Sequence, residues 1–308
     1  MYDLVIIGGG PAASAAAVYA ARKRLQTALI AGEFGGQSVV SADIQNWIGT
    51  PHIAGADLAK NLKAHVLEYA GEFLDVREGV LVTGVTGTAG NFSLTLSKGD
   101  PIIARSVLIA SGSNRRKIDV PGADAFENKG LTYCASCDGP LFADQDVIVV
   151  GGGNAAFETA AQLLAYCKSV TLLNRSAKFR ADEITVSQTM KDPKFKAITE
   201  IELVDVHGED FASGMTIRRL SDKSEETIPG TGIFVEVGQL PNSGFVKDFV
   251  ALTDGGQIKI DPRRQATSTI GVWAAGDVTD VLYHQNNIAA GDAVRALEDI
   301  YIWLHKNK

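Results

Sequence analysis

The order of apolar and polar positions near the start of the chain predicts a strand, a turn and a helix. Leu4–Ile7 is a short apolar run that ends in the glycine-rich sequence Gly8-Gly9-Gly10-Pro11. An alanine-rich segment follows to about Arg24, and a second apolar run, Thr27–Ala31, comes after it. A short apolar run bounded by glycine is typical of a buried strand, and a longer apolar segment is typical of a helix. We therefore expect a strand–turn–helix–strand unit.

The same order recurs once, in the middle of the chain. Val147–Val150 leads into Gly151-Gly152-Gly153, an apolar segment extends from about Ala155 to Tyr166, and the run Val170–Leu173 follows. Each unit has the length of a βαβ module, about thirty residues. Two such units predict two separate doubly wound domains.

Composition indicates where the chain passes between these domains. The apolar run Val107–Ala110 is followed by a polar stretch at residues 113–117. A second break, at residues 239–244, follows the apolar run Ile233–Val237. Each break is expected to be a linker.

The C-terminal part has no glycine-rich turn of its own, so it is expected to complete the first domain. It contains a predicted buried strand, Val272–Ala275, and a predicted helix from about Asn286 to the end. The sequence therefore predicts an α/β protein with two Rossmann-like three-layer dinucleotide-binding domains. Residues 115–244 form the inserted domain, and residues 1–114 and 245–308 form the other.

Overall composition narrows the class of protein. The chain has 308 residues, of which 45% are apolar and 21% charged, which is enough for two cores. A net charge of −7 gives no basic surface for nucleic acid or for an anionic membrane. The uncharged stretch Leu4–Ala21 is cut by three glycines and a proline, so neither a membrane span nor a targeting segment is expected. Three cysteines do not make a secreted disulfide framework, and a cytoplasmic setting is expected.

The first glycine-rich turn fits a phosphate-binding pattern. The sequence Gly8-Gly9-Gly10-Pro11-Ala12-Ala13 matches G-x-G-x-x-A between a predicted strand and a predicted helix. Glycines let the backbone approach a pyrophosphate, whose charge is favoured at a helix N-terminus. Glu33 is the candidate acidic residue that would bind the ribose of the nucleotide. It lies slightly further from the glycine-rich turn than the usual spacing of about twenty residues. A tight βα turn without a ligand would give the same pattern.

The second turn, Gly151-Gly152-Gly153-Asn154-Ala155-Ala156, has the same form, so we expect two dinucleotides, one flavin and one nicotinamide. The strand after it ends in Asn174-Arg175, with Lys178 and Arg180 close behind. Guanidinium groups bind a 2′-phosphate, which a carboxylate would repel, so NADPH is favoured over NADH. A solvated loop would also explain Lys178 and Arg180.

Cys134 and Cys137 form a Cys-x-x-Cys pair. Structural zinc would need further ligands, and Cys167 and the histidines do not lie at the required spacing. A structural disulfide would close too short a loop to stabilise the fold much. A redox pair remains, in which one thiol attacks a disulfide and the other resolves the product, with Asp138 as proton carrier. Cys167 is expected to be a buried apolar residue.

With these motifs, the chain resembles the low-molecular-weight thioredoxin reductases. It also resembles the reductase portion of the flavoprotein component of alkyl hydroperoxide reductase. The resemblance covers essentially the whole chain. The segments that carry it are Gly8-Gly9-Gly10-Pro11, Gly35-Gly36-Gln37, Gln45-Asn46-Trp47, Cys134-Ala135-Ser136-Cys137-Asp138-Gly139, Gly151-Gly152-Gly153-Asn154 and Gly271-Val272-Trp273-Ala274-Ala275-Gly276-Asp277.

The resemblance implies FAD in the domain of residues 1–114 and 245–308, and NAD(P)H in the domain of residues 115–244, which also carries the cysteine pair. The residues expected at FAD are Gly8, Gly10, Pro11, Ala12, Glu33, Gly36, Gln37, Asn46, Ser111, Gly112, Gly276, Asp277, Gln285 and Ala289. The residues expected at the nicotinamide nucleotide are Gly151, Gly153, Asn154, Ala155, Asn174, Arg175 and Arg180.

The resemblance also implies the roles of the cysteine pair. Cys137 would face the flavin, Cys134 would attack the disulfide of a partner protein, and Asp138 would act as acid and base. Because the nicotinamide and the cysteines must both reach the flavin, the resemblance implies that the inserted domain rotates about its two linkers. The partner is expected to be thioredoxin or a thioredoxin-like small protein, and the chain is expected to form a homodimer.

Three features depart from the family pattern. The run Asn174-Arg175-Ser176 lacks one of the phosphate-binding arginines, so NADH remains possible. His284 stands where relatives usually have Arg or Lys, and a variable residue is the simpler interpretation. No thioredoxin-like domain precedes Met1-Tyr2-Asp3, from which we expect the partner disulfide to belong to a separate protein.

Two other functions remain open at this stage. The first is a ferredoxin-dependent disulfide reductase, in which the second glycine-rich turn would be vestigial. The second is a flavoprotein without catalytic activity, which would have no use for the Cys-Ala-Ser-Cys-Asp sequence at residues 134–138.

Overall fold

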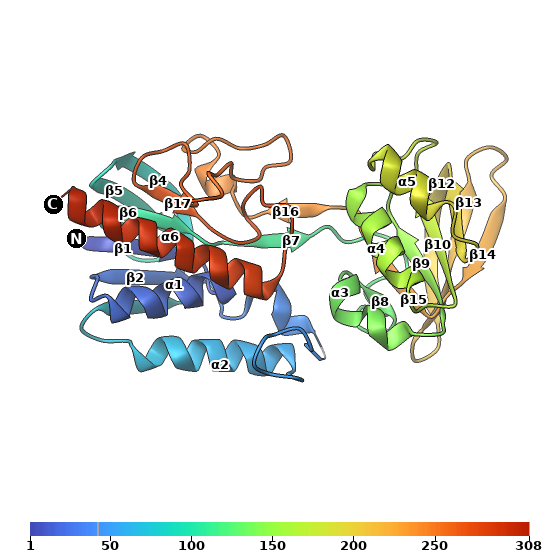
Figure 1. Ribbon diagram of the computed structural model, residues 1–308, viewed down its shortest axis with the longest axis horizontal. Coiled ribbons are helices and arrows are strands. Elements are labelled where there is room, and N and C mark those ends of the chain that lie inside the picture. The colour runs from blue at the N-terminus through green and yellow to red at the C-terminus, as the bar shows by residue number, and fades with distance from the viewer. Residues whose placement is uncertain (42, 308) are drawn as a thin grey trace. The chain divides into compact units, whose positions relative to one another are not determined.

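The computed structural model describes residues 1–41 and 43–307 and divides into two compact units. Unit 1 comprises Met1–Asn114 and Leu240–Lys308, and unit 2 comprises Arg115–Gln239 (Figure 1). The chain crosses between them in two strands, β7 (Ser113–Arg115) and β16 (Gln239–Pro241), which pair with each other.

The second crossing lies a few residues before the boundary expected after Gly244. The backbone N–H of Asn242 donates to the carbonyl of Gly112 at 3.0 Å, and its side-chain amide donates to the carbonyl of Ser111 at 3.0 Å. These bonds fix residues 240–244 to unit 1.

Unit 1 is built on a mixed sheet whose described strands follow the order β3-β2-β1-β6-β5-β4, with β17 also paired to β6. The first three strands, β6 and β17 are parallel, and β4 and β5 are antiparallel. The elements are β1 (Tyr2–Ile7), α1 (Pro11–Arg22), β2 (Thr27–Ala31), α2 (Gly55–Glu68), β3 (Leu74–Glu78), β4 (Val82–Thr88), β5 (Asn91–Leu96), β6 (Ile102–Ile109), β17 (Val272–Ala274) and α6 (Asn286–Lys306).

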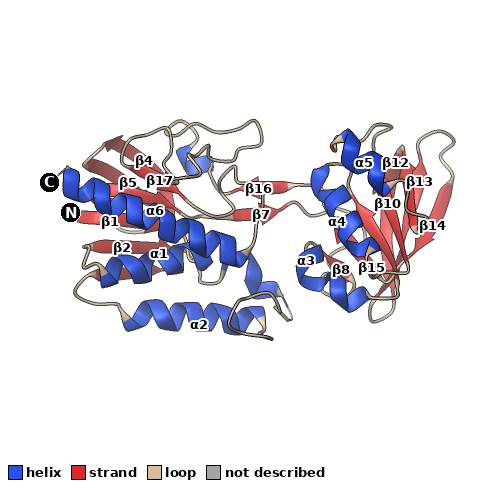
Figure 2. Cartoon of the chain, viewed as in Figure 1, coloured by secondary structure: helices blue, strands red, loops and turns tan. Residues whose placement is uncertain are grey.

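Strand β1 shows why the sheet of unit 1 has a core on each face. Leu4 and Ile6 pack with α1 and α6 on one face, and Val5 and Ile7 pack with β4 and β5 residues on the other. Alternate residues of a strand point to opposite faces, and both faces are apolar here. The alanines of α1 combine high helix propensity with small volume, so that α1 packs closely against α6 (Figure 2).

Unit 2 contains a parallel sheet with the order β11-β10-β9-β15-β8 and a separate antiparallel sheet with the order β12-β13-β14. The parallel-sheet part comprises β8 (Leu131–Thr132), α3 (Ala135–Asp138), β9 (Asp146–Val150), α4 (Asn154–Leu164), β10 (Ser169–Asn174), α5 (Glu183–Thr189), β11 (Phe195–Thr199) and β15 (Gly232–Val235). The antiparallel sheet comprises β12 (Ile201–Gly208), β13 (Ala212–Arg219) and β14 (Glu225–Pro229).

The parallel sheet of unit 2 lies between α4 and the antiparallel sheet. Val147 and Val149 of β9 pack with Phe157 and Leu163 of α4, whereas the other face of β9 packs with Met215 of β13 and its neighbours. The predicted α/β class with two Rossmann-like domains is thus confirmed. Within residues 1–41 and 43–307, no helix has the length and apolar character needed to cross a membrane.

Candidate functional site

The glycine-rich turn after β1 is packed too tightly for side chains at its first two positions. Gly8 has φ +131°, and a Cβ there would lie 2.1 Å from the carbonyl oxygen of Ala110. A Cβ at Gly9 would lie 1.9 Å from the carbonyl oxygen of Glu33. By contrast, a Cβ at Gly10 would meet no atom of the protein within 4 Å. The turn is therefore closed on the protein side and open at Gly10, where α1 begins.

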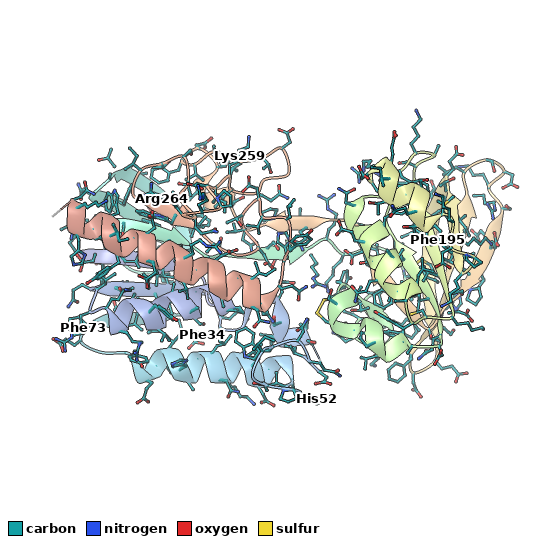
Figure 3. All side chains as sticks on the ribbon, in the orientation of Figure 1. Phe34, His52, Phe73, Phe195, Lys259 and Arg264 are labelled. Carbon is teal, nitrogen blue, oxygen red and sulfur yellow. A yellow bond between two sulfur atoms is a disulfide. The ribbon has the colours of Figure 1, made fainter. Side chains whose placement is uncertain are left out.

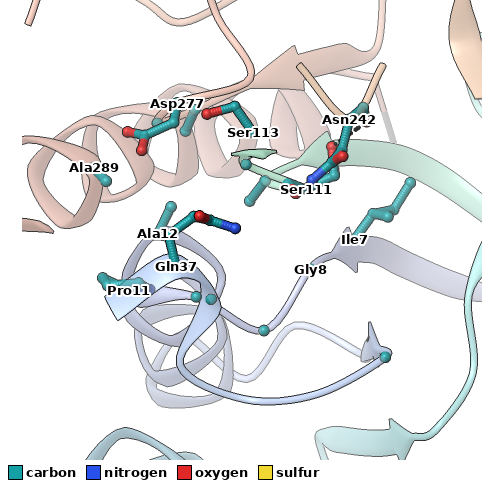
Figure 4. Close-up of a pocket in the computed structure, with 18 of the residues that line it drawn as sticks. Ile7, Gly8, Pro11, Ala12, Gln37, Ser111, Ser113, Asn242, Asp277 and Ala289 are labelled. Atoms are coloured by element: carbon teal, nitrogen blue, oxygen red, sulfur yellow. Dashed lines mark hydrogen bonds between the residues drawn. The ribbon is translucent and has the colours of Figure 1, made fainter. Parts of the chain in front are cut away.

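A cavity of about 530 Å³ lies over this turn (Figure 4). Its volume falls in the range of ligand pockets, about 300–1,000 Å³. The residues expected at FAD that line it are Gly8, Gly10, Pro11, Ala12, Glu33, Gly36, Gln37, Ser111, Gly112, Gly276, Asp277 and Ala289. The cavity thus brings together segments from both ends of unit 1.

Asn46 and Gln285 do not line the cavity but lie together beside it. The Asn46 amide donates to Oε1 of Gln285 at 3.1 Å, and the amide of Asn287 donates to the carbonyl of Asn46 at 2.7 Å. These bonds hold the loop around Asn46 to the start of α6. Close by, Nε2 of His284 is buried and has no hydrogen-bond partner among the described residues.

Asn114 and Asn242, which the sequence did not indicate, join Gln37 and Ser111 in a row of amide and hydroxyl groups along the cavity. Gln37 donates to Asn114 at 3.1 Å, Asn114 donates to Asn242 at 3.2 Å, and the Ser111 hydroxyl donates to the carbonyl of Asn242 at 2.7 Å. Figure 4 shows Gln37, Ser111 and Asn242 around the same space, with Asp277 nearby. Uncharged donors and acceptors of this kind suit the hydroxyls and amides of a polar ligand.

The N-termini of α1 and α6 both reach the cavity, since Pro11 and Asn286 line it. Neither helix has an acidic residue in its first turn. Helix N-termini favour negative charge. The closed turn, the open Gly10 and these helix ends therefore fit a dinucleotide with a pyrophosphate and an electron-rich ring.

The turn after β9 in unit 2 has the same construction. A Cβ at Gly151 would lie 2.4 Å from the carbonyl oxygen of Glu236, and one at Gly152 would lie 2.3 Å from Oδ1 of Asn174. A Cβ at Gly153 would meet nothing within 4 Å, and α4 begins at the next residue. Asn154 and Ala155 are exposed at this start. The residues present fit a second pyrophosphate.

The loop after β10 is shaped by Asn174. The buried side-chain amide of Asn174 donates to the carbonyls of Ser176 at 2.7 Å and Lys178 at 3.1 Å. The backbone N–H of Arg180 donates to the carbonyl of Gly152 at 2.7 Å. The loop therefore lies against the glycine-rich turn and exposes Arg175, Lys178 and Arg180, which are the cationic groups expected at a 2′-phosphate.

Cys134 and Cys137 form a disulfide at α3, with their Cα atoms 5.3 Å apart (Figure 3). Asp138 follows at once, and burial raises the pKa of its carboxyl group above the usual value. The hydroxyl of Thr132 donates a hydrogen bond to Oδ2 of Asp138. The same hydroxyl accepts a hydrogen bond from the backbone N–H of Cys134 at 3.4 Å. The Thr132 bond and the charge of Arg115 both lower that pKa. A carboxyl group whose pKa is raised by burial is better suited to donating a proton than an ordinary exposed carboxylate.

Cys167 differs from the pair. It is buried, its thiol donates to the carbonyl of Phe142 at 3.3 Å, and burial raises its pKa to about 11. A thiol with this pKa is protonated at neutral pH and inert. Across the described part of the chain, no group of three or more His, Cys, Asp or Glu residues could hold a metal ion.

A family model described as pyridine nucleotide-disulphide oxidoreductase matches residues 2–293. The chain belongs to this family, and it is an FAD-dependent oxidoreductase of the low-molecular-weight thioredoxin reductase-like group. The resemblance drawn from the sequence motifs is thereby confirmed. FAD and a pyridine nucleotide are the cofactors that the family implies.

Solved structures and curated relatives agree with this assignment. Thioredoxin reductase from Streptococcus pyogenes MGAS5005 matches with 32% identity and a TM-score of 0.91, covering 99% of each chain. Thioredoxin reductase from Giardia duodenalis matches with 28% identity and a TM-score of 0.93, again covering 99% of each chain. The F component of alkyl hydroperoxide reductase from Staphylococcus aureus (strain Mu50 / ATCC 700699) is 36% identical over 306 residues, which is 99% of this chain. The chain spans 60% of the length of that relative.

Proposed function

We propose that the protein reduces the disulfide of thioredoxin or of a thioredoxin-like small protein, with NADPH as electron donor. FAD would lie in the cavity of unit 1, and NADPH would lie at the glycine-rich turn of unit 2. The observation that carries the proposal is the Cys134–Cys137 disulfide followed by a half-buried Asp138, in a chain with two glycine-rich turns that each begin a helix. Bound FAD would supply the redox chemistry that links a nicotinamide hydride to a disulfide.

The cysteines and Asp138 would perform the thiol chemistry. Once the pair is reduced, the thiolate of Cys134 attacks the partner disulfide, forms a mixed disulfide and expels one partner sulfur as a thiolate. Cys137 then attacks Sγ of Cys134, which releases the second partner sulfur and re-forms the Cys134–Cys137 disulfide. Asp138 gives its proton to the first leaving sulfur, accepts the proton of the Cys137 thiol as Cys137 attacks, and passes that proton to the second leaving sulfur; solvent then restores the proton of Asp138. The two partner sulfurs thus leave as thiols.

The names of the relatives indicate two kinds of partner protein. The structural relatives are named thioredoxin reductases, whereas the curated relatives are named as the F component of alkyl hydroperoxide reductase. A thioredoxin-like carrier that serves a peroxide-reducing protein is therefore the second candidate. Parallel turnover assays with thioredoxin and with such a carrier as the acceptor separate the two.

Arg175 offers a test of the donor. Replacing Arg175 with Gln is expected to lower kcat/KM for NADPH about tenfold and to leave that for NADH unchanged, because only NADPH carries a phosphate for the guanidinium to bind. The matched control is Arg218→Gln on β13, an exposed arginine that pairs with Glu225 and Glu202. Equal losses with NADPH and NADH would contradict the assignment, and activity with reduced ferredoxin alone would favour a ferredoxin-dependent enzyme.

Thr132 offers a test of the proton carrier. Because its hydroxyl lowers the pKa of Asp138, Thr132→Val is expected to raise that pKa. The limb of the pH–rate profile that falls as Asp138 loses its proton should then move to higher pH. Thr132→Ser keeps the hydroxyl and should keep the wild-type profile. A limb that stays in place or moves to lower pH in Thr132→Val would show that Asp138 is not the titrating group.

A further inference from the structure

Unit 2 contains a partly buried carboxyl group, that of Glu236, which the proposed electron path does not use. Glu236 directly follows β15, and its backbone N–H donates to the carbonyl of Val150 at 2.8 Å. The backbone carbonyl oxygen of Glu236 lies beside Gly151, where it leaves no room for a side chain. Its side chain is fixed as well, since the hydroxyl of Thr159 on α4 donates to Oε1 at 2.9 Å. Glu236 is thus bonded both to the strand that enters the glycine-rich turn and to the helix that leaves it.

The strand order places Glu236 on a particular side of this turn. In the sheet β11-β10-β9-β15-β8, the chain continues from β9 to β10 on one side, and β15 pairs with β9 on the other. Dinucleotides bind across such a switch point, at the carboxyl ends of the strands. The loop after β10, which carries Arg175, takes the adenosine half. The nicotinamide half then extends over the carboxyl end of β15, where Glu236 lies.

We propose that Glu236 contacts the nicotinamide ring and that its charge sets the preference between the oxidised and the reduced nucleotide. This inference rests on the proposed use of unit 2 for the pyridine nucleotide. The oxidised ring is a cation and the reduced ring is neutral. An ionised Glu236 therefore attracts the oxidised ring, and a protonated Glu236 does not discriminate by charge.

The surroundings of Glu236 place its titration near neutral pH. Burial raises its pKa to about 7; the Thr159 hydrogen bond and the charge of Arg115 lower the pKa, and the charge of Glu158 raises it. A cation beside a carboxylate lowers its pKa by about one unit or more. By linkage, binding of the oxidised nucleotide should tighten about tenfold as the pH rises through the pKa of Glu236.

The test compares two nucleotides on the oxidised, FAD-loaded enzyme. One is NADP⁺, and the other is 1,4,5,6-tetrahydro-NADP, whose ring is neutral and cannot transfer a hydride. Calorimetry gives both Kd values from about pH 5.5 to 8.5, a range that brackets the Glu236 pKa of about 7. The ratio of the two Kd values cancels the titration of the 2′-phosphate, whose pKa is about 6.

In the wild type, the Kd for NADP⁺ divided by the Kd for 1,4,5,6-tetrahydro-NADP should fall about tenfold as the pH rises. In Glu236→Gln, which keeps the shape and removes the charge, the ratio should be independent of pH. A pH-independent ratio in the wild type, or the same shift in Glu236→Gln, overturns the inference. If neither nucleotide binds, the proposed nucleotide site itself is wrong.

A second variant keeps the test decisive if Glu236→Gln does not fold. Thr159→Val removes the hydrogen bond that lowers the Glu236 pKa, so the midpoint of the shift in the Kd ratio should move to higher pH. Thr159→Ser, which retains the hydroxyl, should leave the midpoint in place. A midpoint unchanged in Thr159→Val would show that the titrating group is not Glu236.

Discussion

Replacing Cys134 with Ser is expected to abolish reduction of the partner disulfide, by on the order of a thousandfold or more. Serine cannot form a disulfide with Cys137, and its hydroxyl cannot replace a thiolate as the nucleophile. Reduction of ferricyanide by NADPH, which needs the flavin but not the cysteines, should persist. Turnover with the partner and with ferricyanide, measured on the same preparation, checks this result.

Cys167→Ser is the matched control for this substitution. Cys167 is buried, and its pKa of about 11 keeps it protonated at neutral pH. Partner reduction should therefore stay near the wild-type rate, with a stability change of about 1 kcal/mol. An equal loss of partner reduction in Cys167→Ser and Cys134→Ser would show that the Cys134–Cys137 pair is not the specific electron carrier.

The second large effect is expected at the first glycine-rich turn. In Gly8→Ala, the new methyl group would lie 2.1 Å from the carbonyl oxygen of Ala110, at a φ of +131° that L-residues rarely adopt. Relieving this clash should cost about 2–4 kcal/mol of the free energy of unfolding, and it should distort the turn that holds the pyrophosphate. A lowered melting temperature together with a lowered FAD content checks the prediction.

Gly10→Ala separates folding from cofactor binding. A methyl group at Gly10 meets no protein atom within 4 Å, and α1 begins directly after it. The apoprotein should therefore be as stable as the wild type. FAD should bind about tenfold more weakly, because the methyl group occupies space that the pyrophosphate needs. FAD affinity unchanged in Gly10→Ala would contradict the placement of the pyrophosphate.

The two glycine-rich turns could be predicted because their signal is local. Each consists of an apolar strand, consecutive glycines and a helix within one short segment, and the structure has both where the pattern indicates, at Gly8 and Gly151. The cysteine pair is local in the same way. Predictions of this kind depend on contacts between neighbours in the sequence.

Gln37 was expected at the cofactor, but its link to Asn114 and Asn242 could not be predicted, because the three residues lie far apart in the sequence. Gln37 meets Asn114, and Asn114 meets Asn242, only after the sheet of unit 1 has formed. The antiparallel sheet β12-β13-β14 was likewise not anticipated, because its polar, exposed positions do not mark strands clearly. Asn174 was expected at the nucleotide, and the structure adds that its amide shapes the loop that presents Arg175.

Thr132 and Glu236 had weak sequence signals that the motifs overshadowed. Glu236 is the acidic residue within the apolar run Ile233–Val237, and an acidic residue in a buried strand needs a partner. Thr132 is separated from Cys134 by a single residue, but the sequence does not show that its hydroxyl reaches Asp138. Both roles depend on side-chain directions that only the folded structure provides.

The most direct test of the account is an anaerobic titration with NADPH that follows the flavin absorbance and counts free thiols. In the wild type, the Cys134–Cys137 disulfide and the flavin both accept electrons, so full reduction should consume twice as many equivalents as in Cys134→Ser. Thiols should appear in the wild type as the flavin is reduced and reoxidise when a partner disulfide is added. Equal consumption by the two proteins, with no new thiols, would contradict the account.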